Sequence, residues 1–173
     1  MKQAVILSAI LATLVQYVNA DEIIDSNPVE EEDVLPLKIA SRSDARLGQV
    51  DGDRFIVSLM KMNWFSAYVF CSQQNATLLS LELGNADIKK QQFIDFITFY
   101  HLQSRPYWLS GNRLEDEVTF LWGLGGVPVS YTDWNPGEPN NMGGPQRCIK
   151  LFPVMTWDDE GCFAQWYAAC QKN

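Results

Sequence analysis

The sequence predicts an α+β domain, and three features of its 173 residues lead to this expectation. Two stretches in the first half carry apolar residues at helical spacing. The second half, after Pro106, holds short apolar runs separated by Gly, Pro and Asn, as in strands joined by loops. No segment of the chain repeats another. Helices followed by a strand-rich half are typical of an α+β architecture.

The elements of the first half follow from local patterns. Residues 54–60, RFIVSLM, are β-branched and apolar enough for a strand. A helix follows, because Trp64, Tyr68 and Cys71 recur at helical spacing and Asn63 can cap its N-terminus. Residues 76–81 predict a short strand. Residues 85–100 predict a second, amphipathic helix, with apolar positions at Ile88, Phe93, Phe96, Ile97 and Tyr100.

The second half predicts five short strands, YWLSG, VTFLWG, CIKLF, MTW and WYAAC. A long segment rich in Gly and Pro separates Trp122 from Cys148. Loops of this length are usually functional or disordered. Tyr131 and Trp134 inside the segment argue against disorder, so we expect a loop that is held in shape, with Trp134 bracing it.

The first 20 residues are typical of a secretory signal peptide. Lys2 gives a positive start, residues 4–18 are mostly apolar, and Ala20 ends a suitable cleavage site. A membrane anchor is the alternative, but about 20 apolar residues are needed to span a bilayer. Gln16 and Asn19 interrupt the run. The mature protein is therefore expected to be secreted and extracellular, with no membrane span.

The composition is acidic. Residues 1–20 contain Lys2 and no acidic residue, so their removal changes the formal net charge from -8 to -9. This charge argues against nucleic acid and anionic membranes as partners. Residues 21–46 are acidic and interrupted by Pro28 and Pro36. They predict a flexible N-terminal segment ahead of one domain at residues 47–173.

Four cysteines, Cys71, Cys148, Cys162 and Cys170, remain after cleavage. An even number in a secreted chain predicts two disulfides, and four cysteines allow three pairings. Zinc is the rival explanation, but the sequence has no CxxC spacing and a single histidine, His101. Asn75 begins the sequon Asn-Ala-Thr and is a candidate glycosylation site.

A set of oxygen-bearing side chains surrounds the stretch WNPGEPNN. Glu138 and Asn140 flank Pro139 in this stretch. A bridge between Cys148 and Cys162 would bring residues 157–159 against the long loop. An oxygen cage could then form from Glu138, Asn140, Gln146, Asp158 and Asp159. Calcium takes six to eight oxygens at about 2.3 to 2.6 Å. Taken alone, WDDEGC also fits a solvated acidic turn.

Three short motifs resemble those of C-type lectins. Residues 138–140 resemble the family's EPN motif, residues 157–159 its WND motif, and residues 108–111 its WIGL segment. The resemblance covers residues 47–173, and the composition is similar to that of small secreted insect lectins. It implies the short form of the C-type lectin-like fold, with two helices, small antiparallel sheets and a long calcium-binding loop. It also implies the disulfides Cys71–Cys170 and Cys148–Cys162.

In this family the calcium ion that the loop binds also binds the sugar. Each of two sugar hydroxyls meets an acid that accepts a hydrogen bond and an amide that donates one. Glu138 and Asn140 match the first such pair, and Pro139 matches a cis-proline of the family that aims both side chains at the ion. The EPN order goes with mannose and fucose, and the reversed QPD order with galactose.

The second pair departs from the family pattern. Gln146 stands where the family has Glu, and Asp158 where it has Asn, so acid and amide are exchanged. The acids Glu138, Asp158 and Asp159 still sum to -3, which favours a retained calcium site. The exchange reverses the hydrogen bonds at one hydroxyl and leaves galactose open as the ligand. A second calcium is not expected, because Arg147 stands where members with one carry an acid.

Two other classes of function compete with this interpretation. A hydrolase would need an acid–base pair among the acids of the cage, but carboxylates bound to calcium are poor general acids, and no nucleophile accompanies His101. We therefore expect that this protein is not an enzyme. The stronger rival is a C-type lectin-like domain that binds protein and no sugar. If sugar binding holds, one monosaccharide binds weakly, and useful affinity needs oligomers or clustered glycans.

Overall fold

The structure is a computed structural model and describes residues 48–82 and 84–173. The predicted signal peptide at residues 1–20 and the predicted acidic segment at residues 21–46 lie outside the described residues. Among the described helices, none has the length and apolar character needed to cross a membrane.

Two helices form where the sequence predicts them. Helix α3, Trp64–Gln73, begins after Asn63, whose Oδ1 accepts a hydrogen bond of 2.8 Å from the backbone NH of Ser66. This is the N-cap that satisfies a free backbone donor of the first turn. Helix α4, Ala86–Phe99, buries Ala86, Phe93 and Ile97. Ile88 is 65% exposed, so its assignment to the buried face was wrong. It lies two residues after Ala86, which is about 200° around the helix axis.

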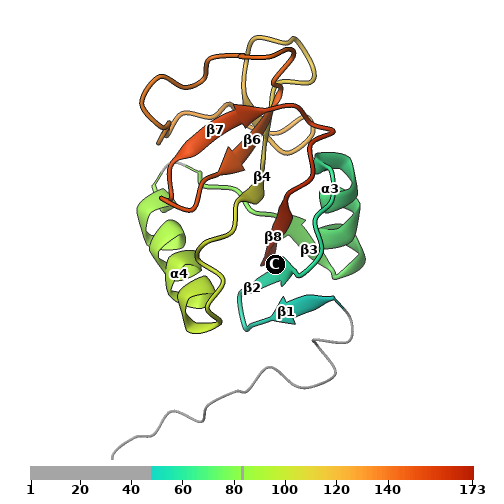
Figure 1. The fold of residues 1–173 in the computed structure, drawn as a ribbon, viewed down its shortest axis with the longest axis vertical. Helices are drawn as coiled ribbons and strands as arrows, with labels where there is room; N and C mark the ends of the chain where they lie inside the picture. Colours follow the sequence, from blue (N-terminus) through green and yellow to red (C-terminus); the bar gives the residue numbers. More distant parts are fainter. Residues whose placement is uncertain (1–47, 83) are drawn as a thin grey trace, which may run out of the picture. The chain divides into compact units, whose positions relative to one another are not determined.

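Eight strands build one sheet in the order β1-β2-β8-β4-β6-β7, with β3 paired to β8 and β5 paired to β4. Strands β4 and β8 are parallel, and the other pairs are antiparallel. Figure 1 shows the helices on either side of β4 and β8, and the long loop beyond β6 and β7. The α+β prediction is confirmed. The strands are β1 Gln49–Asp51, β2 Phe55–Ser58, β3 Ala76–Leu78, β4 Tyr107–Asn112, β5 Leu121–Trp122, β6 Cys148–Leu151, β7 Trp157–Glu160 and β8 Tyr167–Lys172.

The strands expected at residues 54–60 and 76–81 shorten to β2 and β3, and three further strands differ from the sequence prediction. β1 was not predicted, and the strand expected at residues 118–123 shortens to the two residues of β5. The strand expected at residues 155–157 begins at Trp157 and continues through the acids to Glu160. Acidic residues are depleted in strands, so propensity argues against this segment. Its antiparallel pairing with β6 along the full length of β7 overrides that preference.

The core contains four tryptophans, because Trp64, Trp108, Trp122 and Trp157 are each 4% exposed or less. Trp166 is partly buried against the part of the core that holds Trp64 and Trp108. Both disulfides implied by the family resemblance are present. Cys71–Cys170 joins α3 to β8, and Cys148–Cys162 joins the start of β6 to the segment after β7.

Candidate functional site

The loop at residues 123–147 is anchored to Phe120 and to the start of β7 by aromatic and polar contacts. Trp134 packs against Phe120 and Trp157, with ring centroids 5.1 and 5.6 Å apart. It therefore braces the loop, as expected. Two backbone hydrogen bonds of 2.8 Å, Asn135 NH to Trp157 O and Trp157 NH to Asp133 O, fix the loop to the start of β7.

Helix α4 supports the same loop from the side. The Tyr131 hydroxyl donates a hydrogen bond of 2.8 Å to Asp87, and Lys90 forms an ion pair with Asp133. Asp87 and Lys90 both belong to α4. The loop therefore rests on a helix as well as on the sheet. The expectation of a loop held in shape is confirmed.

The stretch around Pro139 places an acid and an amide side by side. The Glu138–Pro139 peptide bond is cis. Asn140 Nδ2 donates a hydrogen bond of 2.7 Å to Glu138 Oε1, so both side chains point to the same side of the proline. The amide oxygen of Asn140 accepts a hydrogen bond of 2.7 Å from the backbone NH of Met142.

Three carboxylates converge at this point. Glu138, Asp158 and Asp159 each offer an oxygen within 4.8 Å of the others. Asp158 is 8% exposed and Asp159 is fully buried, so WDDE is a buried strand and the solvated-turn alternative is wrong. Partial burial raises the pKa of Glu138 to about 7, and the negative charges of Asp158 and Asp159 act in the same direction. Clustered acids of this kind favour a bound cation.

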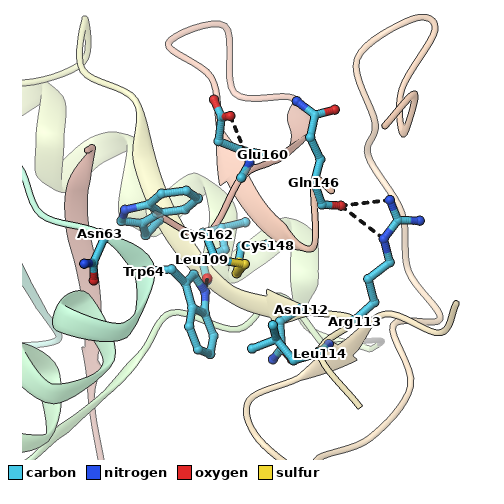
Figure 2. Close-up of a disulfide and its surroundings, with 12 residues drawn as sticks. Asn63, Trp64, Leu109, Asn112, Arg113, Leu114, Gln146, Cys148, Glu160 and Cys162 are labelled. Atoms are coloured by element: carbon cyan, nitrogen blue, oxygen red, sulfur yellow. Dashed lines mark hydrogen bonds between the residues drawn. A yellow bond between two sulfur atoms is a disulfide. The ribbon is translucent and has the colours of Figure 1, made fainter. Parts of the chain in front are cut away.

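Asp159 is the most heavily hydrogen-bonded of the three. Its carboxylate accepts from the backbone NH groups of Asn140 and Asn141 at 2.9 and 3.2 Å. It also accepts from a terminal guanidinium nitrogen of Arg113 at 3.0 Å. Arg113 further donates to the backbone oxygen of Gln146, as Figure 2 shows. The sequence analysis did not identify Arg113.

Asp158 has a cationic partner that the sequence analysis also missed. Lys150 Nζ lies 2.9 Å from Asp158 Oδ2 and 2.9 Å from Glu160 Oε2. Burial by itself would lower the pKa of Lys150, but the hydrogen bonds and charges of these two acids outweigh it and raise the pKa. The count of -3 for the cage included its three acids alone. Arg113 and Lys150 add +2, and Glu160, which shares Lys150, adds -1, so these six residues sum to -2.

Gln146 contributes in two ways. Its backbone oxygen accepts the two hydrogen bonds from Arg113, at 3.1 and 2.8 Å. Its side-chain oxygen Oε1 is buried and has no hydrogen-bond partner among residues 48–82 and 84–173. Figure 2 shows the carboxamide directed away from the guanidinium. A buried acceptor without a donor is costly, so this oxygen calls for a cation or a donor from outside the chain.

The other predicted residues lie outside this cluster. Asn75 is exposed at the end of α3 and is available for modification. His101 is exposed after α4. Arg147 forms an ion pair of 2.6 Å with Glu117. The arginine that contacts Asp159 and Asn141 is Arg113.

Comparison with known proteins now defines the family. The model of the lectin C-type domain matches residues 60–172, well over half of the chain. The chain belongs to the C-type lectin domain family. This C-type lectin domain protein is 27% identical over 142 residues to C-type lectin 37Db of Drosophila melanogaster. The alignment covers 80% of this chain and 90% of the relative.

Two further matches delimit what this C-type lectin domain shares with its relatives. It is 32% identical over 99 residues to the low affinity immunoglobulin epsilon Fc receptor of Mus musculus, covering 57% of this chain but only 27% of the receptor. The mouse scavenger receptor C-type lectin carbohydrate-recognition domain superposes with a TM-score of 0.58 at 24% identity, covering 72% of this chain and 95% of that domain. The last match establishes the fold alone.

Proposed function

We propose that this protein is a secreted, calcium-dependent lectin that binds sugar hydroxyls through the cluster at Glu138. The observation that carries the proposal is the convergence of three carboxylates on one point of a braced loop. Family membership supports carbohydrate binding in general. The leader-like residues 1–20 support secretion. C-type lectin domains are typically not enzymes, so we propose binding and no catalysis.

The residues present fit calcium by their chemistry. Carboxylates from both the loop and β7 provide charge, and the partnerless oxygen of Gln146 provides a neutral ligand. Oxygen-only sets that mix carboxylates with amide carbonyls are what calcium selects. The residues proposed to hold the ion are Glu138, Asn140, Gln146, Asp158 and Asp159. A bound calcium ion would supply positive charge and open coordination positions for hydroxyl oxygens.

The protein side chains would determine how a sugar is oriented. Glu138 accepts from a sugar hydroxyl and Asn140 donates to one, since they already lie side by side. Asp158 and Gln146 form the second pair with acceptor and donor exchanged. The first pair favours mannose or fucose, and the exchange leaves galactose as the competing ligand. A site on a loop surface makes few contacts with one monosaccharide, so clustered glycans or oligomers would raise the avidity.

A specific observation favours a second candidate, a protein-binding module without sugar binding. Arg113 already pairs with Asp159, and Lys150, which Asp158 shares with Glu160, already pairs with Asp158. A cluster whose acids are satisfied internally needs a metal less than an unpaired cluster does.

A glycan array probed with the secreted protein in calcium and in EDTA separates the candidates. Binding of mannose, fucose or galactose glycans that disappears in EDTA supports the proposal. Glycan binding that EDTA leaves unchanged contradicts the calcium dependence. Failure to bind in both buffers, together with no effect of calcium on the melting temperature, favours the protein-binding module.

A further inference from the structure

Arg113 is fixed to the sheet before its side chain reaches the loop. It follows directly on β4, and its backbone NH donates a hydrogen bond of 2.8 Å to the oxygen of Arg147, the residue before β6. Its oxygen accepts from the backbone NH of Glu117 at 3.1 Å. Its guanidinium lies 4.9 Å from the ring centroid of Phe120. Arg113 is therefore held by contacts at its backbone and at its guanidinium.

The guanidinium of Arg113 connects three separate points of the site. Nε and one terminal nitrogen donate to the backbone oxygen of Gln146 at 3.1 and 2.8 Å. The same terminal nitrogen lies 3.1 Å from Asn141 Oδ1 and 3.0 Å from Asp159 Oδ2. Asn141 Oδ1 also accepts from the backbone NH of Gln146 at 2.9 Å. The two ends of the segment 141–146 and one acid of β7 thus share a single cation.

The charge of Asp159 explains why this cation matters. The Asp159 side chain is fully buried, while that of Arg113 is 16% exposed. A buried carboxylate is stable only when it is paired and hydrogen-bonded. Arg113 and the backbone NH groups of Asn140 and Asn141 meet this need from within the chain. The charge of Asp159 is therefore paired and hydrogen-bonded by groups of the chain itself.

We propose that Arg113 is a positioning residue that holds residues 140–146 and Asp159 in their binding arrangement in the calcium-free protein. A loop that is ordered before the ligand arrives does not lose its conformational entropy on binding, so binding is tighter. The expected effect on calcium affinity rests on the proposed function. The expected order of the loop in the calcium-free protein does not rest on the proposed function.

The planar fork of arginine is essential to this role. Its several N–H groups point in fixed directions and reach the three oxygens at once, whereas a lysine ammonium acts as one point charge on a flexible stem. Arg113→Lys keeps the charge and loses the fork, and Arg113→Gln loses both. Arg147 offers a matched control, since it lies next to the same loop but pairs only with the exposed Glu117 in the described structure.

Hydrogen exchange in EDTA, followed by mass spectrometry, tests the proposal. We expect the amides of Asn140 and Asn141 to be protected in the natural protein, and their exchange to rise roughly tenfold or more in both Arg113 variants. Arg147→Gln should exchange like the natural protein. Peptides from β2 and β8 should stay protected in every variant. Unchanged exchange at Asn140 and Asn141 in Arg113→Gln would overturn the proposal.

Calcium titration of the same variants separates positioning from charge. If Arg113 acted only as a repelling charge, Arg113→Gln would bind calcium more tightly and Arg113→Lys would match the natural protein. We expect both variants to bind calcium several-fold more weakly, because the loop must first be ordered. Tighter binding in Arg113→Gln would contradict positioning. If the natural protein binds no calcium, the proposed function fails, and the exchange experiment in EDTA still decides the role of Arg113. Should Arg113→Gln not fold, Arg113→Lys and Asn141→Ala provide the same comparison.

Discussion

Lys150 and Asp158 lie opposite each other on β6 and β7, and the ammonium nitrogen of Lys150 is 2.9 Å from one carboxylate oxygen of Asp158. A ligand proposed for calcium therefore already has one oxygen bound to a cation of the protein. The Lys150 side chain is only 6% exposed, so solvent screens this charge poorly. Its presence lowers the negative potential that a calcium ion would meet.

Replacing Lys150 with Met should tighten calcium binding. Met keeps the apolar stem but removes a positive charge near the proposed ligands, and we expect calcium to bind several-fold more tightly. The calcium-free protein should lose about 1 to 3 kcal/mol of stability, since Asp158 loses its buried partner. Calorimetric titration and thermal unfolding in EDTA measure the two effects. Lys172→Met, which removes the partly exposed pair with Asp51, is the control. An unchanged calcium affinity would contradict the prediction.

Asp159→Ala should abolish any stabilisation of the fold by calcium. It removes a charged ligand and the acceptor of hydrogen bonds from Asn140, Asn141 and Arg113. The melting temperature in EDTA should also fall, because Arg113 loses its carboxylate partner. Asp116→Ala is the matched control, since the hydrogen bonds of Asp116 are confined to its own turn. A calcium-dependent shift that survives in Asp159→Ala would mean that calcium binds elsewhere.

The exchanged pair Gln146 and Asp158 should behave as a unit. Gln146→Glu alone raises the acids of the cage to -4 and leaves no donor for the sugar hydroxyl. Asp158→Asn alone lowers them to -2 and leaves no carboxylate to accept from the sugar hydroxyl. It also leaves Lys150 with only one of its two acidic partners, Glu160. The double variant returns to -3 with the order of the family, and should favour mannose or fucose over galactose. A double-mutant cycle of sugar affinity measures the coupling. Additive losses would show that the two residues do not share a hydroxyl.

Calcium affinity should depend on pH through Glu138. Its pKa is raised to about 7, so the calcium-free site binds a proton that the unfolded chain, with an ordinary value of 4.5, has already released. This group therefore makes the calcium-free fold less stable as pH rises from 4.5 to 7. Calcium needs the ionised carboxylate, so its affinity should rise over the same range and level off above pH 7. Titrations at pH 5.5, 6.5 and 7.5 test the trend, and an affinity that stays constant with pH would refute it.

Local patterns predicted the parts of the structure that depend on neighbouring residues. Asn63 caps α3, and the second helix, Ala86–Phe99, lies within one residue of its expected limits at each end. The family resemblance gave the pairing of the cysteines, which spacing alone left open among three possibilities. The acids of β7 were expected against the loop, but their depletion in strands hid the fact that they continue the strand.

The sequence-based prediction of the site lacked the two cations, Arg113 and Lys150, that contact its acids. Arg113 is 46 residues from Asp159 in the sequence, and its contact depends on where β4 ends relative to β6. Lys150 could have been found, because a hairpin closed by Cys148–Cys162 sets the register of the two strands. The strand predicted at residues 155–157 ends before Asp158, so the prediction places no residue of the neighbouring strand opposite that acid. Charge counted from acids alone therefore overstated the attraction for a metal.

The Cys71–Cys170 disulfide joins a residue before the long loop to a residue after it, 99 positions apart. A protease that cuts within residues 123–147 would thus produce two peptides that remain one molecule until a thiol reductant separates them. The amino-terminal peptide keeps α3, and the carboxy-terminal peptide keeps β8 beside it. Scission would then disable the loop while the two peptides stay joined. On a non-reducing gel the cleaved and intact forms would migrate at nearly the same position, so an inactivated population would remain hidden until the sample is reduced.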